Sequence, residues 1–234
     1  PQNPFGQPVA FFGRAEGNGF PGDPANTESD TFRFSTSLQG VTDTGFWEVS
    51  YTRAVNDFVF RVPDVLNTEF QLALYGLGGS NCDPIAGTPG VGDCEFFNPF
   101  ATSYTTAPNS DYVVSSFTGT EVIDSKADLE VFEAITSFDV FEMGGGFAAL
   151  ALGVQYRENQ LSQDYDDLAN QDSFTFVIGN PDIDGSQDVW AAFGELALPI
   201  NDELDVQLAV RYEDYGGTIG STVDPKLAIS WRAT

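Results

Sequence analysis

The chain has 234 residues, enough for a large domain, and carries 35 acidic against 9 basic side chains, a formal net charge of −26. A surface this acidic repels phosphate backbones, which excludes nucleic-acid binding. The absence of histidine excludes His-based triads and His metal sites. No motif selects a pair of catalytic carboxylates, so the sequence predicts a protein that is not an enzyme.

The N-terminal residues 1–31 are rich in Gly, Pro, Asn and acids and predict a loop. No segment approaches the roughly 20 apolar residues of a membrane helix, and no signal peptide opens the chain. The start, "PQNPFGQPV", has the composition of a loop inside a protein. We therefore expect the chain to be a fragment of a longer one.

Seven segments after residue 31 alternate apolar and polar residues, the period of a β-strand with two unlike faces. The clearest is "DELDVQLAVRYED", where Leu204, Val206 and Leu208 alternate with charged or polar residues. In chain order the seven are "TFRFSTSLQ", "FWEVSYTRA", "ADLEVFEAITSFDV", "FAALALGVQYRE", "DVWAAFGELAL", "DELDVQLAVRYED" and "VDPKLAISWR".

Two long stretches, about residues 56–126 and 158–187, have no regular alternation and predict loops. Within the first, the apolar spacing from Leu66 to Leu77 predicts a short helix that stops at Gly78.

The same stretch holds the two cysteines, Cys82 and Cys94, in a segment rich in Gly and Pro. A short loop closed by two cysteines predicts a disulfide, and two thiols alone do not complete a zinc site. The neighbouring Phe96, Phe97 and Phe100 are expected to pack beside this disulfide, with the lining of a ligand vestibule as the alternative.

The connections between strands differ in length. Short turns, near 40–45, 141–146 and 199–203, follow the first, third and fifth strands, whereas longer connections follow the second, fourth and sixth. This asymmetry is typical of outer-membrane barrels, which have short periplasmic turns and long extracellular loops. The pattern predicts an all-β, antiparallel transmembrane β-barrel, and a soluble sheet with one solvated face is the alternative.

In a barrel, the polar positions face the lumen and the apolar positions face lipid. The residues expected to face the lumen are Arg33, Arg157, Glu195, Asp205, Gln207, Arg211, Glu213 and Lys226. The residues expected to face lipid are Leu150, Leu152, Val154, Leu204, Val206, Leu208, Val210, Leu227 and Ile229.

Acidic residues also gather in the segment "DIDGSQD", where Asp182, Asp184 and Asp188 are weak candidates for Ca²⁺ ligands. The segment lacks the spacing of an EF-hand loop, so a solvated surface loop without metal is the favoured interpretation, and no other cofactor is expected. Divalent cations bridging surface acids to lipopolysaccharide are a further hypothesis.

Several phrases together resemble one family: "GDCEFFNPFATSY", "GVQYREN", "GELALPI" and "VQLAVRYEDYGGTIGSTVDPKLAISW". They resemble the barrel of TonB-dependent outer-membrane receptors over most of residues 32–232. The resemblance implies that residues 32–234 supply seven or eight strands of a roughly 22-stranded barrel, with residues 1–31 leading into it.

That resemblance implies further properties. Such receptors lie in the outer membrane of Gram-negative bacteria, contact lipid and lipopolysaccharide, and import an iron chelate, a vitamin or an oligosaccharide. The TonB complex acts on them through an N-terminal plug, for which this sequence shows no candidate. A small stand-alone outer-membrane barrel and a soluble secreted binding domain are the alternatives.

Overall fold

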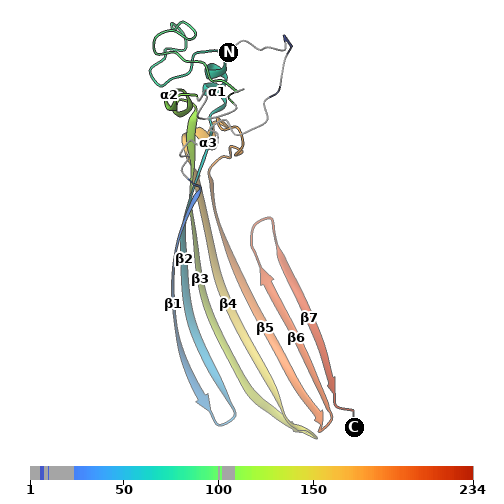
Figure 1. Ribbon diagram of the computed structural model, residues 1–234. Coiled ribbons are helices and arrows are strands. Elements are labelled where there is room, and N and C mark those ends of the chain that lie inside the picture. The colour runs from blue at the N-terminus through green and yellow to red at the C-terminus, as the bar shows by residue number, and fades with distance from the viewer. Residues whose placement is uncertain (1–5, 8–9, 11–23, 100, 102–108, 234) are drawn as a thin grey trace. The chain divides into compact units, whose positions relative to one another are not determined.

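The structure, a computed structural model, describes residues 6–7, 10, 24–99, 101 and 109–233. Its seven strands form one antiparallel sheet in the order β1-β2-β3-β4-β5-β6-β7, so that each strand lies beside its neighbours in sequence (Figure 1). The predicted all-β class and strand number are therefore confirmed. Among the described residues, the helices are all too short or too polar to cross a membrane.

The elements have the following bounds: β1 (Asn26–Thr42), β2 (Gly45–Val65), α1 (Asn67–Leu74), α2 (Asp111–Ser115), β3 (Thr118–Met143), β4 (Gly146–Tyr165), α3 (Asp167–Asn170), β5 (Ile183–Asn201), β6 (Leu204–Asp214) and β7 (Ser221–Trp231).

The strands are longer than their alternation predicts. The assignment of residues 1–31 to a loop is wrong at its end, because β1 begins at Asn26. The irregular stretch expected at 56–126 is confined to 66–117, and the one expected at 158–187 is confined to 166–182. Backbone hydrogen bonds hold these strand ends, and such bonds do not depend on the polarity of the side chains.

The turns are correspondingly shorter. Residues 43–44, 144–145 and 202–203 connect β1 to β2, β3 to β4, and β5 to β6. Because neighbouring strands are antiparallel, these turns share one end of the sheet, and the longer connections after β2, β4 and β6 share the other. The predicted asymmetry of the connections is confirmed.

The chain divides into two compact units. The loop unit comprises the described residues within 1–29, 58–125 and 163–183. The sheet unit comprises the described residues within 30–57, 126–162 and 184–234.

In the sheet unit, the strand register places residues with similar side chains opposite one another on neighbouring strands. Leu196 of β5 lies opposite Leu208 of β6, which lies opposite Leu227 of β7. Three positions further along β6, Arg211 lies opposite Phe193 on one side and Asp224 on the other. Since successive side chains point to opposite faces, these two rows belong to opposite faces of the sheet.

A close contact between a glycine and an aromatic ring also links neighbouring strands of the sheet unit. The ring of Phe193 on β5 occupies the space that a Cβ at Gly153 of β4 would need. The Arg211 guanidinium lies over the same ring, with its carbon 5.9 Å from the ring centroid. Glycine is required at 153 because of this close approach, and the ring in turn supports Arg211.

The loop unit has a small hydrophobic core of its own. Phe70, Phe97 and Phe117 pack with ring centroids 5.1–5.3 Å apart, two of the pairs edge to face. Ala73 and Val113, both fully buried, join them from α1 and α2. This core brings together residues far apart in the sequence.

The predicted helix near residues 66–77 is confirmed as α1, which places Phe70, Ala73 and Leu74 on the core side. The predicted stop at Gly78 is wrong. The helix ends with Tyr75 as its C-cap, and Gly76 follows with φ of +83°. A left-handed residue directly after the C-cap is the common way to end a helix, and glycine adopts it without strain.

The loop unit should depend on the aromatic part of its core. We expect Phe117→Ala to lower its unfolding free energy by about 3–5 kcal/mol, because it leaves a cavity among packed rings. Hydrogen exchange of α1 and α2 in the intact protein would measure this. The matched control is Tyr75→Ala, since Tyr75 is 70% exposed and its loss should leave exchange unchanged. Equal exchange in the two variants would show that the core does not stabilise the unit.

Candidate functional site

The polar face of the sheet unit carries a connected hydrogen-bond network. Gln155 donates to Glu133 at 2.7 Å, and Arg211 donates to Gln155 at 3.4 Å. Arg211 also pairs with Glu213 at 2.8 Å, and the Tyr215 hydroxyl donates to Glu213 at 2.7 Å. Side chains from β3, β4 and β6 are thereby held in fixed positions on one face.

Nearer the short turns, two more pairs cross between neighbouring strands on the polar face. Gln207 of β6 donates to Glu195 of β5 at 2.5 Å. Arg232, just after β7, pairs with Asp205 of β6 at 3.4 Å. Opposite groups on adjacent strands stabilise the sheet modestly and fix side-chain positions.

Three other basic side chains of the polar face differ from Arg211 and Arg232. In the part of the chain that the structure describes, Arg33, Arg157 and Lys226 have no carboxylate oxygen within 4.0 Å. The Nε atom of Arg157 is buried and has no described hydrogen-bond acceptor. Among the described residues, ion pairs on this face therefore involve Arg211 and Arg232 but not these three bases.

The opposite face of the sheet unit is apolar and open. Leu227 and Ile229 of β7 are 63% and 64% exposed, and Leu208 and Val210 of β6 are also exposed. A folded domain in water would bury a row of this kind, because each exposed aliphatic side chain forgoes roughly 1.5–3 kcal/mol of burial.

The apolar face ends in a band of aromatic residues. Tyr51 lies 4.6 Å from Phe132, and Tyr156 lies 4.7 Å from Trp190, measured between ring centroids. Phe34 of β1 extends this band, 6.4 Å from Tyr51.

Charged residues follow the aromatic band on the same face. Arg53, next in alternation after Tyr51, pairs with Asp128 at 2.7 Å and Glu130 at 3.5 Å. Lys126 lies 3.9 Å from Asp57. Sequence reasoning missed this row, although continuing the alternation of β2 and β3 beyond the aromatic residues would have found it.

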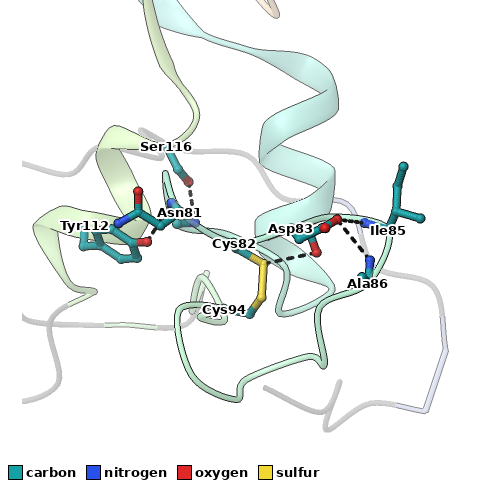
Figure 2. Close-up of a disulfide and its surroundings, with 9 residues drawn as sticks. Asn81, Cys82, Asp83, Ile85, Ala86, Cys94, Tyr112 and Ser116 are labelled. Carbon is teal, nitrogen blue, oxygen red and sulfur yellow. Dashed lines mark hydrogen bonds between the residues drawn. A yellow bond between two sulfur atoms is a disulfide. The ribbon is translucent and has the colours of Figure 1, made fainter.

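In the loop unit, the predicted disulfide between Cys82 and Cys94 is confirmed, with an S–S distance of 2.03 Å (Figure 2). The Asp83 carboxylate accepts backbone N–H groups of Ile85 at 2.8 Å and Ala86 at 3.0 Å. These bonds, from Ala86 and then Ile85, hold the pKa of Asp83 below its usual value.

Helix α2 is tied to the chain just before the disulfide. Tyr112 of α2 accepts the backbone N–H of Asn81 at 2.7 Å, and Ser116 accepts that of Gly79 at 2.9 Å (Figure 2). The cross-link and these bonds together make the loop unit a folded body.

The phenylalanines expected to pack beside the disulfide differ in their surroundings. Phe97 is buried in the loop-unit core, which confirms packing for this residue. Phe96 is partly exposed, and its ring lies where a Cβ at Gly76 or Gly90 would be. Phe100 lies outside the described residues.

Two aspartates that the sequence analysis did not single out hold the 166–182 connection. Asp166 caps α3 by accepting from Leu168 and Ala169, and it also accepts the Val122 N–H at 2.6 Å. Asp64 accepts the N–H groups of Phe176 and Val177 at 2.7 and 2.8 Å. An Asp before "DLAN" is a helix N-cap signal, but the role of Asp64 depends on contacts distant in sequence.

The three candidate metal ligands are not brought together as a ligand set. Asp182 accepts from the Tyr165 N–H at 2.9 Å and from the Asn170 amide. Asp184 is exposed on β5. The Asp188 carboxylate instead accepts a hydrogen bond from the Tyr156 hydroxyl. Across the described ranges, no group of three or more acidic or cysteine side chains is arranged to hold a metal ion.

One antiparallel sheet with an apolar face, a polar face, an aromatic band and long connections at one end defines the class of outer-membrane β-barrels. Within that class, the chain belongs to the TonB-dependent receptors: the family model "TonB dependent receptor-like, beta-barrel" matches residues 1–234. Members of this family act in outer-membrane transport. A search of curated proteins found no match.

The disulfide should stabilise the loop between its cysteines. Replacing Cys82 and Cys94 together by Ser removes a cross-link that spans 12 positions, and we expect a local loss of about 3 kcal/mol from loop-closure entropy. Limited proteolysis within 83–93 should become faster, whereas exchange of the buried Phe117 amide should change little. Unchanged proteolysis would contradict this role.

Proposed function

We propose that this chain forms part of the barrel of a TonB-dependent receptor that imports a scarce nutrient across the outer membrane of a Gram-negative bacterium. The nutrient class is an iron chelate, a vitamin or an oligosaccharide. The observation that carries the proposal is the sorting of side chains in the sheet unit, with a hydrogen-bonded network on one face and an open aliphatic surface on the other.

In this proposal the apolar face contacts lipid. On β6 it runs from Leu204 to Tyr212, which at about 3.3 Å per residue gives roughly 30 Å along the strand. With a tilt of about 40°, that length spans roughly the apolar band of an outer-membrane barrel. The aromatic band then lies at the outer interface, and the Arg53–Asp128–Glu130 row lies among lipid headgroups and lipopolysaccharide.

The residues that we propose to face lipid are Leu150, Leu152, Val154, Leu204, Val206, Leu208, Val210, Leu227 and Ile229.

The polar face lines the lumen. Its network presents fixed polar groups to the interior of the barrel, and Arg33, Arg157 and Lys226 offer positive charge without a described carboxylate oxygen within 4.0 Å. Carboxylates of a plug, through which the TonB complex would act, are suitable partners for these bases. The remaining residues that we propose to face the lumen are Glu195, Asp205, Gln207, Arg211 and Glu213.

The long connections follow the strand ends nearest the aromatic band and are proposed to be extracellular. The chain is proposed to need no cofactor and to have no enzymatic role, because the fixed polar groups serve binding and passage.

Two adjacent residues of β6 test the assignment of the faces. We expect Leu208→Arg to destabilise the membrane-embedded protein by about 2–4 kcal/mol, since it places a charge in the apolar band. Ala209→Arg is the matched control, because Ala209 lies between Glu195 and Lys226 on the polar face, where attraction to one and repulsion from the other offset and no charge enters the apolar band. Urea unfolding in lipid vesicles would measure both, and equal losses would contradict the assignment.

Transport itself can be tested in the native bacterium. Deleting the gene should abolish growth on one limiting nutrient from a panel of iron chelates, vitamins and oligosaccharides, and inactivating TonB should give the same defect. Complementation with the intact gene is the control. Growth that does not change on any nutrient, or uptake that continues without TonB, would overturn the proposal.

A further inference from the structure

The loop unit contains a buried carboxylic acid. Glu121, on β3, is 3% exposed and is the one charged side chain among the buried residues that the structure describes. It belongs to none of the segments that we propose to cross the membrane. Burial and then the nearby carboxylates of Asp166 and Asp64 raise the pKa of Glu121 above its usual value.

The charges acting on Glu121 are acidic on both packed sides. Asp166 comes from the N-cap of α3, and Asp64 comes from β2. In the described part of the loop unit, the only base is Arg61, which pairs with Glu28 at 3.3 Å. No described cation offsets the charge that Glu121 would carry on ionisation.

The same two acids hold the 166–182 connection. Asp166 accepts the Val122 N–H, directly beside Glu121 in sequence, and so fixes the start of the connection to β3. Asp64 accepts from Phe176 and Val177 and so fixes the later part to β2. Phe174, 3% exposed, is buried between these anchors and bridges to Leu66.

Ionisation of Glu121 would therefore act against this docking. It would place a negative charge at a buried position near two carboxyl groups whose hydrogen bonds close the connection onto the strands. Opening the connection would admit water to all three groups and relieve both the desolvation and the repulsion.

We propose that the 166–182 connection is a pH-sensitive surface loop, docked on β2 and β3 while Glu121 is protonated and released when Glu121 ionises. The docked state binds a proton more tightly than the open state. Docking is therefore strongest below the ordinary carboxyl pKa of about 4.3 and weakens as the pH rises through the raised pKa of Glu121. The extracellular position of the loop rests on the proposed function, whereas its docking does not.

Hydrogen exchange in the intact protein, purified in detergent, tests this directly. The probes are the amides of Phe176 and Val177, with Phe117 in the loop-unit core as an internal reference. After correction for intrinsic exchange, we expect their protection to fall severalfold as the pH rises from about 4, below the ordinary carboxyl pKa, to about 8.

Two variants test whether ionisation of Glu121 causes the loss of protection. Glu121→Gln should keep the amides protected across the whole range, because it cannot ionise. The matched control Asp124→Asn removes an exposed acid from the same strand and should keep the wild-type pH dependence. If Glu121→Gln does not fold, the wild-type series still decides, since protection that does not change with pH overturns the proposal.

The proposal is also overturned if Glu121→Gln retains the wild-type pH dependence. Each readout concerns loop docking in purified protein. A negative result would therefore leave the transport proposal intact, and a failed uptake experiment would leave the switch intact.

Discussion

The structure depends on the backbone pairing of each strand with the next strand in sequence. In the ladder from β1 to β7, antiparallel neighbours satisfy each other's N–H and C=O groups, the requirement that any strand must meet in a lipid environment. Once the backbone is satisfied in this way, side chains are free to differ between the two faces. The register that aligns Leu196, Leu208 and Leu227 therefore also aligns Phe193, Arg211 and Asp224.

The parts of the fold that sequence could predict are those governed by local pattern. The alternation of Leu204 to Tyr212 was sufficient to identify β6 and its two faces, because each residue reports its own face. The ends of β2, β3 and β4 could not be predicted, since their pairing depends on neighbouring strands and not on side-chain polarity. The disulfide was predictable from two cysteines in one short loop.

The polar contacts of the loop unit show where prediction from local sequence patterns ends. Asp64 binds N–H groups more than a hundred positions away in the sequence, and the buried Glu121 lies near Asp64 before it and Asp166 after it. Nothing local distinguishes these two acids from the many solvated acids of the chain. By contrast, Arg53 could have been found, because it continues an alternation already identified.

The two units also differ in how they are stabilised. The loop unit has a core of aromatic rings, a cross-link and capped helices, and so resembles a small globular body. The sheet unit places few side chains in a core and leaves its aliphatic row open. A medium that accepts aliphatic side chains can stabilise such a sheet, and water cannot.

The contact between Gly153 and Phe193 has a consequence for how this sequence can change. A side chain at 153 requires the space that the ring occupies, and loss of the ring removes the surface that supports Arg211. Neither residue can therefore be substituted alone without disturbing the polar network. Across related barrels, glycine at the first position and an aromatic residue at the second should be inherited as a pair and should be replaced together.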